Sequence, residues 1–128
     1  SVSLESENSF QTPMRGEQKA IIHVSCREKS TDFYVYLGGM FLSDHGDFGV
    51  VTYRIDKNKA DWMSMTESTN HEALGLWQGA GIRFLKNVMT GRNLLWRISP
   101  FNESPFTVVF KVAGLDEAIK PLRQACGW

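Results

Sequence analysis

The sequence predicts a mainly β (α+β) fold: an antiparallel β-sandwich or flattened barrel of about seven or eight strands with two short helices. Three observations predict it. Short segments of alternating apolar and polar residues recur along the chain, turn-forming residues separate them, and two segments have apolar residues at helical spacing. No repeat, low-complexity tract or linker interrupts the chain, so we expect residues 1–128 to form a single domain.

The predicted strands are rich in β-branched and aromatic residues, and polar turn segments separate them. Alternation of Val2 with Leu4 indicates the end of a first strand. The other strands are expected at residues 19–26, 32–38, 49–56, 60–65, 73–77, 93–99 and 106–112.

Alternation within these segments also predicts which side chains face the core. In one of them Phe33, Val35 and Leu37 share a face, while Tyr34 and Tyr36 share the opposite face. Such one-sided patterns are typical of antiparallel sheets that have one face in water. We therefore expect the first three side chains to be buried and the two tyrosines to point outward.

Helical spacing first occurs in residues 81–90. There Ile82, Leu85 and Met89 lie at i, i+3 and i+7, which is the pattern of a helix with one apolar face. Gly91 follows the last of these residues and is expected to cap the helix.

Residues 115–126 predict the second helix, which carries acidic residues in its first turn, where they favour the helix dipole. Pro121 has no N–H to bond the carbonyl of Glu117, so this helix should kink there or be short. The apolar residues of its buried face are Leu115, Ala118, Ile119 and Leu122.

The two cysteines, Cys26 and Cys126, favour a disulfide. Their wide spacing and the lack of a Cys-x-x-Cys motif argue against a redox pair or a zinc ribbon. Cys26 is in phase with Ile22 and Val24, so its thiol should point inward. The bond would close a loop of about 100 residues, which stabilises the folded state by roughly 4.7 kcal/mol. It also implies an oxidising compartment. The alternative is a pair of buried free thiols in a cytosolic protein.

The composition excludes several classes of function. Lys+Arg and Asp+Glu both number 14, so the chain lacks the basic excess that a nucleic-acid partner requires. Its apolar runs are far shorter than the roughly 20 residues of a membrane-spanning helix. The chain starts at Ser1 without methionine, so we expect that any signal peptide has been removed.

No motif for a catalytic nucleophile or a phosphate-binding loop is present, so we predict no cofactor and no catalytic residue. His45 with Asp44 and Asp47 could suggest a metal ligand set. Adjacent residues do not easily converge on one ion, however, and such clusters are typical of turns. We therefore predict a turn at these residues and no metal.

A second histidine, His71, lies in the polar segment 66–72 together with Glu67 and Glu72. This grouping could perform acid–base chemistry. The alternative is a loop between two strands in which Ser, Thr and Asn side chains bond the local backbone. Loops on rigid scaffolds often bind ligands, so we include His71 in a candidate binding surface.

The main part of that candidate surface is the outward-facing set of His23, Tyr34 and Tyr36. If their strands pair, these side chains lie together on one exposed sheet face. Tyrosine is favoured in contact surfaces because it buries a large area while its hydroxyl stays wet. The alternative is that a helix covers this face.

Four blocks of the sequence, residues 67–77, 82–86, 99–105 and 114–128, together resemble the VasI/TagO family of type VI secretion-associated envelope proteins. The resemblance runs from about Val2 to the end of the chain, and its last block is the most specific. It implies an exported, periplasmic protein of Gram-negative bacteria that is encoded with the contractile secretion apparatus. It implies no catalytic motif.

The function expected from this resemblance is that of a non-enzymatic periplasmic accessory protein, which binds a component of the envelope or of the secretion machine. A second hypothesis is a cell-wall glycan-binding module that uses exposed aromatic residues such as Tyr34, Tyr36 or Trp62, and therefore contacts peptidoglycan. A third is an envelope hydrolase that uses His71 with Glu67 or Glu72.

Overall fold

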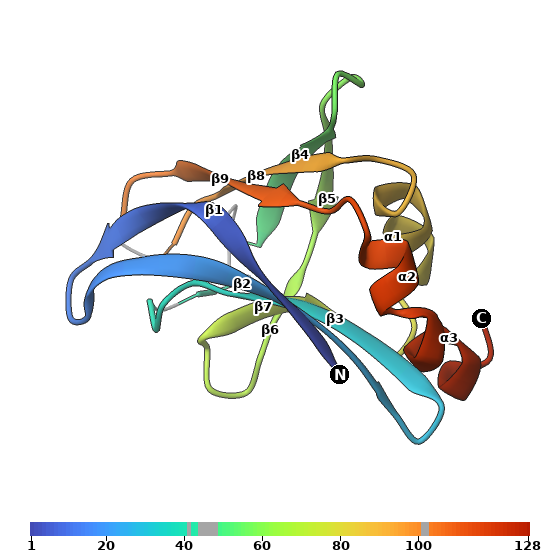
Figure 1. Cartoon of the computed structure of the whole chain (residues 1–128). Coiled ribbons are helices and arrows are strands. Elements are labelled where there is room, and N and C mark those ends of the chain that lie inside the picture. The colour runs from blue at the N-terminus through green and yellow to red at the C-terminus, as the bar shows by residue number, and fades with distance from the viewer. Residues whose placement is uncertain (41, 44–48, 101–102) are drawn as a thin grey trace.

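The computed structural model describes residues 1–40, 42–43, 49–100 and 103–128 (Figure 1). In these residues nine strands form two antiparallel sheets, and three short helices lie at one end of the molecule. The sheets enclose a common core, so the predicted mainly β fold is confirmed. No continuous ladder of hydrogen bonds closes the described strands into a barrel.

All paired strands in both sheets are antiparallel. The first sheet has the order β1-β2-β3-β7-β6, and the second has the order β5-β4-β8-β9. The strands of the first sheet are β1 Val2–Thr12, β2 Gly16–Arg27, β3 Ser30–Tyr36, β6 Thr66–Glu67 and β7 Ala73–Leu76. Those of the second are β4 Val50–Ile55, β5 Asp61–Ser64, β8 Asn93–Ile98 and β9 Phe106–Lys111.

The first two strands are longer than predicted and form one hairpin. At its turn the Thr12 Oγ1 donates to the carbonyl of Gly16 at 2.9 Å and accepts from the N–H of Arg15 at 3.0 Å. Residues 5–12 are mostly polar because β1 is the edge strand of its sheet, so alternation is too weak there to predict a strand. The short β6 was likewise not predicted, because it lies in a polar segment.

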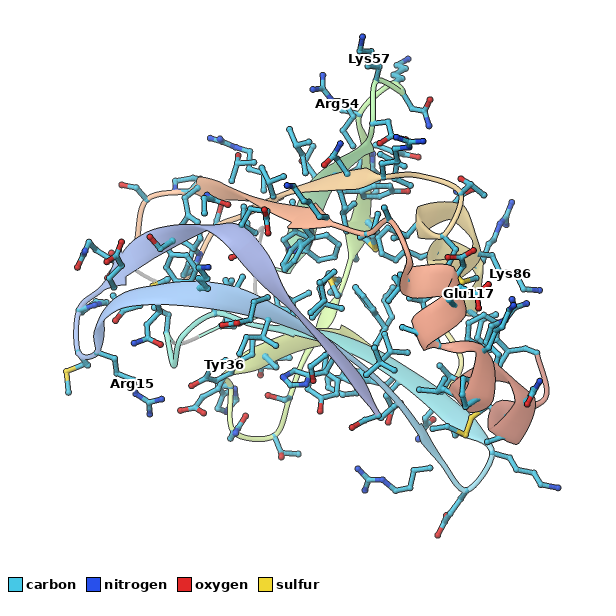
Figure 2. The ribbon with its side chains drawn as sticks, in the orientation of Figure 1. Arg15, Tyr36, Arg54, Lys57, Lys86 and Glu117 are labelled. Atoms are coloured by element: carbon cyan, nitrogen blue, oxygen red, sulfur yellow. A yellow bond between two sulfur atoms is a disulfide. The ribbon has the colours of Figure 1, made fainter. Side chains whose placement is uncertain are left out.

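The core lies between the inner faces of the two sheets, where side chains fill the space (Figure 2). Phe33 of β3 and Trp96 of β8 meet Phe84 of α1 (Ile82–Val88), with ring centroids 5.3 to 5.9 Å apart. Phe33, Val35 and Leu37 are buried, as alternation predicts. Burial of each such side chain contributes about 1.5–3 kcal/mol to folding.

The edges of the two sheets meet where β1 lies beside β9, and one amide group joins them. The Asn8 Nδ2 donates to the carbonyl of Thr107 at 3.0 Å, and its Oδ1 accepts from the N–H of Val109 at 2.9 Å. A bulge in β1 makes this contact accessible, and there the N–H of Ala20 donates to the buried Ser6 hydroxyl at 3.0 Å. Side chains therefore replace the backbone ladder at this seam.

Helix α1 is shorter than the predicted 81–90, and Gly91 does not cap it. The cap position is Met89, which has ordinary helical dihedral angles. Gly91 has no positive φ, but a Cβ at this position would overlap the side chain of Ile55. Close approach of the backbone to β4, and not a left-handed cap, therefore explains this glycine.

The second predicted helix is in fact two helices, α2 (Leu115–Ala118) and α3 (Lys120–Cys126). The chain leaves helical geometry at Ile119, where φ is −95° and ψ is 1°. Pro121 thus lies in the first turn of α3, where its missing N–H removes no helical bond. The break that proline predicts is present, two residues before it. Leu115, Ile119 and Leu122 pack into the core as predicted, whereas Ala118, the fourth residue of the predicted buried face, is exposed.

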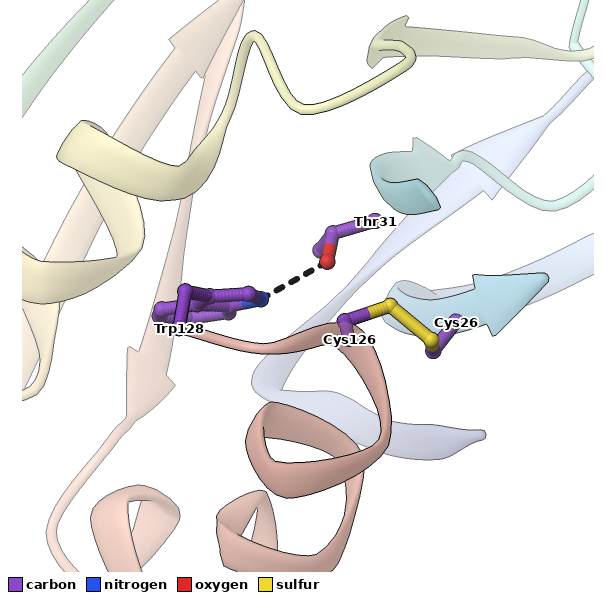
Figure 3. Close-up of a disulfide and its surroundings, with 4 residues drawn as sticks. All are labelled: Cys26, Thr31, Cys126 and Trp128. Carbon is purple, nitrogen blue, oxygen red and sulfur yellow. Dashed lines mark hydrogen bonds between the residues drawn. A yellow bond between two sulfur atoms is a disulfide. The ribbon is translucent and has the colours of Figure 1, made fainter. Parts of the chain in front are cut away.

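The C-terminus is tied to the end of the β2–β3 hairpin (Figure 3). A disulfide joins Cys26 and Cys126, whose Cα atoms are 5.9 Å apart across 100 residues of sequence. The Trp128 Nε1 donates to Thr31 Oγ1 at 2.7 Å, and Thr31 is the register partner of Cys26. The guanidinium of Arg123 lies 4.9 Å from the centroid of the Trp128 ring. We call these contacts the C-terminal latch.

Breaking the disulfide should weaken the protein strongly. Cys126→Ser is expected to lower the free energy of unfolding by about 2–5 kcal/mol, because loss of the disulfide raises the conformational entropy of the unfolded chain. Denaturant unfolding monitored by tryptophan fluorescence measures this. The control is wild-type protein unfolded in the presence of a reductant, whose free energy of unfolding should fall by the same amount relative to unreduced wild type. Free thiols in unreduced, denatured wild-type protein would contradict the prediction.

Candidate binding surface

Three rings lie stacked across the outer face of the first sheet. His23 of β2 and Tyr34 of β3 are register partners, and their ring centroids are 4.9 Å apart at an interplanar angle of 21°. Trp77, which directly follows β7, lies on the other side of Tyr34 at 5.4 Å and 22°. We call His23, Tyr34 and Trp77 the aromatic stack. It forms an apolar strip of stacked rings that crosses three adjacent strands.

A glycine makes room for the third ring. Gly75 is the register partner of Tyr34, so the face of β7 carries no side chain at that position. A Cβ on Gly75 would lie only 2.5 Å from Cζ2 of Trp77, which shows that the indole lies directly over the glycine backbone. The indole is oriented by its Nε1, which donates to the carbonyl of Thr66 at 3.0 Å.

Tyr36, two residues further along β3, lies in a polar environment. Its hydroxyl accepts from Nη1 of Arg15 at 2.7 Å, and Nη2 of the same guanidinium is 3.9 Å from a carboxylate oxygen of Glu72. Figure 2 shows Arg15 and Tyr36 on the same side of the molecule. The predicted surface therefore has an apolar part, the aromatic stack, and a charged end at Tyr36.

His71 lies in the hairpin loop between β6 and β7. Its Nδ1 is 3.1 Å from Oε1 of Glu67, so this part of the expected acid–base group does come together. Glu72 instead lies beside Arg15. The loop is held by local bonds, as the loop interpretation predicts: Asn70 Oδ1 accepts from Ser68 Oγ at 2.6 Å and from the N–H of Glu72.

Burial gives His23 an uncharged ring near neutral pH. Desolvation in the stack lowers the pKa of its imidazole below the ordinary value near 6.5. Its Nδ1 shares a hydrogen bond with the hydroxyl of Ser3, 2.9 Å away on β1. A neutral imidazole packs against Tyr34 without bringing a charge into the apolar strip.

No helix of the described part of the chain covers this face. The helices α1, α2 and α3 all lie at the end of the sandwich where β2 and β3 turn (Figure 1). The four aromatic side chains concerned are each partly exposed: His23, Tyr34, Tyr36 and Trp77. The alternative expectation, a helix layer over the tyrosines, does not hold for the residues described.

Sequence reasoning missed Trp77 and Arg15. Trp77 was predicted only as the last residue of a strand, and Arg15 belonged to no predicted element. A glycine two residues before a tryptophan was the one signal for the stack, because small residues on a sheet often lie under aromatic rings. That signal becomes specific only when the register places Gly75 opposite Tyr34.

Other candidate sites are few. Among the described residues no group of three or more His, Cys, Asp or Glu side chains is arranged to hold a metal. His45, with Asp44 and Asp47, lies outside the described residues. The helices within the described ranges are all too short or too polar to cross a membrane.

These features define a class: a disulfide-latched antiparallel β-sandwich with an aromatic surface on one sheet. Comparison with protein families then identifies the family. The model described as Type VI secretion system VasI, EvfG matches residues 4–128, so this chain belongs to that family and the resemblance noted from the sequence is confirmed. Neither a curated protein nor a solved structure matches the chain significantly.

Gly75→Ala tests the geometry of the stack. The added methyl group must displace the Trp77 ring, so we expect a loss of about 1–3 kcal/mol in stability and a changed near-ultraviolet circular dichroism spectrum. The control is the same substitution in a Trp77→Ala background, where the clash no longer exists and the added cost should be small. An equal cost in both backgrounds would show that Trp77 does not lie over Gly75.

His23 predicts a pH dependence of stability. Its pKa is lower in the folded than in the unfolded state, so between the two values the unfolded chain holds more protons and stability rises with pH. The contribution of neutral His23 to the free energy of unfolding is complete above about pH 6.5 and is lost as the pH falls through the pKa of the folded state. Denaturant unfolding between pH 7.5 and 5 should give a smaller decrease for His23→Gln than for wild type. Identical slopes would refute the assignment.

Proposed function

We propose that this protein is a non-enzymatic accessory subunit of a type VI secretion system that acts in the periplasm. It binds an envelope or secretion-machine component through the aromatic stack and the adjoining Tyr36. Membership of the secretion-system family supports the pathway. The single observation that carries the binding role is the stack itself, an apolar strip on a sheet face that no described helix covers.

The disulfide supports the compartment. A bond that joins residues 26 and 126 forms and persists in oxidising environments such as the bacterial periplasm, and is rare in the reducing cytosol. The latch depends on this bond, so the folded protein is suited to an exported location. The partner would then be an envelope-exposed subunit or another component of the cell envelope.

The stack has the properties of a binding hot spot. Tyr and Trp are enriched at such positions because each buries a large area at the cost of only two side-chain torsions. Here Tyr34 is already held between two rings, so binding would cost little further ordering of that side chain. The charged side chains of Arg15 and Glu72 would lie at the polar rim of the interface and orient the partner.

A cell-wall glycan is the second candidate ligand. Tyr34 and Trp77 are both partly exposed, and exposed aromatic side chains can pack against the apolar faces of sugar rings. A hydrolase is a weaker hypothesis, because the pairing of Glu72 with Arg15 leaves His71 with Glu67 alone from the expected acid–base group.

Crosslinking and co-purification of the tagged protein from cells test the proposal. Tyr34→Glu places a charge in the middle of the stack and should reduce recovery of secretion-machine subunits at least about tenfold, since hot-spot residues contribute ~2 kcal/mol or more. The matched control is Gln124→Glu, which adds the same charge at an exposed position of α3. Equal recovery for the two variants would refute the binding role.

Sedimentation with purified peptidoglycan separates the two ligand classes. Binding to the wall polymer that Tyr34→Glu abolishes, without recovery of any secretion subunit, would assign the stack to glycan. Absence of sedimentation together with recovery of secretion subunits would assign it to protein.

A further inference from the structure

The outer face of the second sheet carries a different set of side chains. Trp62 on the edge strand β5 is 65% exposed, which is unusual for so large an apolar side chain. Its register partner is Thr52 of β4, and the partner of Thr52 on the next strand is Arg97 of β8. These three side chains therefore form one row across the sheet. Arg54 lies two residues beyond Thr52 and is paired with Leu95. We call Arg54, Trp62, Leu95 and Arg97 the arginine face.

The charges on this face are of one sign. Arg54 and Arg97 are exposed, and within the described residues neither forms a salt bridge. Alternation along the strands directs no carboxylate of β4, β5, β8 or β9 to this side, because Asp61 is paired with the inward-facing Tyr53. Arg54 and Lys57 project from the hairpin between β4 and β5 (Figure 2).

The nearest acidic group at this hairpin is already engaged. The carboxylate of Asp56 accepts the backbone N–H of Asn93 at 2.8 Å and that of Arg92 at 3.0 Å. These bonds hold the pKa of Asp56 below its ordinary value and fix the hairpin to the start of β8. Asp56 is thus held on the backbone of Arg92 and Asn93, and within the described residues it forms no salt bridge with Arg54 or Arg97.

The arginine face is also hollowed. A depression of about 240 Å³ has Leu95 and Thr52 in its lining, with the side chains of Arg54 and Arg97 also around it. Such a hollow can receive an apolar side chain, while carboxylates on either side of that side chain can reach the guanidinium groups in a bidentate geometry. Trp and Arg are the residues most enriched at the energetic centre of protein interfaces.

We propose that the arginine face is a second docking site, which binds an acidic polypeptide segment of a partner protein. A membrane surface fits less well, because the hairpin tip at residues 56–59 has no apolar side chain to insert and Trp62 lies on a strand behind this tip. A flat membrane surface would also leave the hollow unfilled. The face lies on the opposite sheet from the aromatic stack, so both can be occupied together. The protein would then bridge two components, a role that goes beyond the proposed function.

The test uses a fluorescein-labelled peptide of glutamate residues interspersed with leucine, titrated with the whole chain and followed by fluorescence anisotropy. Arg54→Gln/Arg97→Gln should weaken binding at least about tenfold, Trp62→Ala should weaken it similarly, and wild-type affinity should fall with added salt. The control Arg83→Gln/Lys86→Gln removes the same charge from α1 and should bind like wild type. Near-ultraviolet circular dichroism checks that each variant is folded.

Three outcomes would overturn the proposal. The first is that wild type binds a peptide with glutamine in place of glutamate as well as it binds the acidic peptide, and the second is that the two double variants weaken binding equally. The third is arginine-dependent binding to phosphatidylglycerol vesicles without binding to the peptide. Tyr34→Glu separates this site from the proposed function. It should leave peptide binding unchanged while it reduces recovery of the partner of the aromatic stack, so either proposal can fail without the other.

Discussion

The structure depends most on the latch between the C-terminus and the β2–β3 hairpin. Helices α2 and α3 have four and seven residues, and helices so short are not stable alone in water. They are held because Leu115, Ile119 and Leu122 enter the core and because Cys126 and Trp128 attach to the paired residues Cys26 and Thr31. The latch thereby closes one end of the sandwich, and the three helices of the described residues lie there and not over the outer sheet faces.

The Asn8 bridge performs a related task at the edge of the sandwich. An open edge strand exposes unpaired backbone groups, which favour pairing with other chains. The amide of Asn8 bonds both the carbonyl of Thr107 and the N–H of Val109, so β9 is partly satisfied without a full ladder. The two sheets can then keep separate orientations while they share one core, and their outer faces can differ in chemistry.

That difference is the main functional lesson. The first sheet presents stacked, uncharged rings, and the second presents two arginines and an exposed tryptophan. The net charge of zero for the chain does not reveal this difference between the two faces. Two unlike faces on one disulfide-bonded core are what the two proposed docking sites require.

The sequence by itself determined the fold class, the inward faces of the strands and the outward placement of His23, Tyr34 and Tyr36, because alternation is a local pattern. It also determined the disulfide, because two cysteines allow only one pairing. It did not determine the length of β1, whose polar edge residues carry no alternation, or the reason for Gly91, which is a contact with β4. Only the tertiary structure placed Trp77 over Gly75 and aligned Trp62, Thr52 and Arg97, because both arrangements depend on the register between strands distant in sequence, and register is set by packing of the whole sheet.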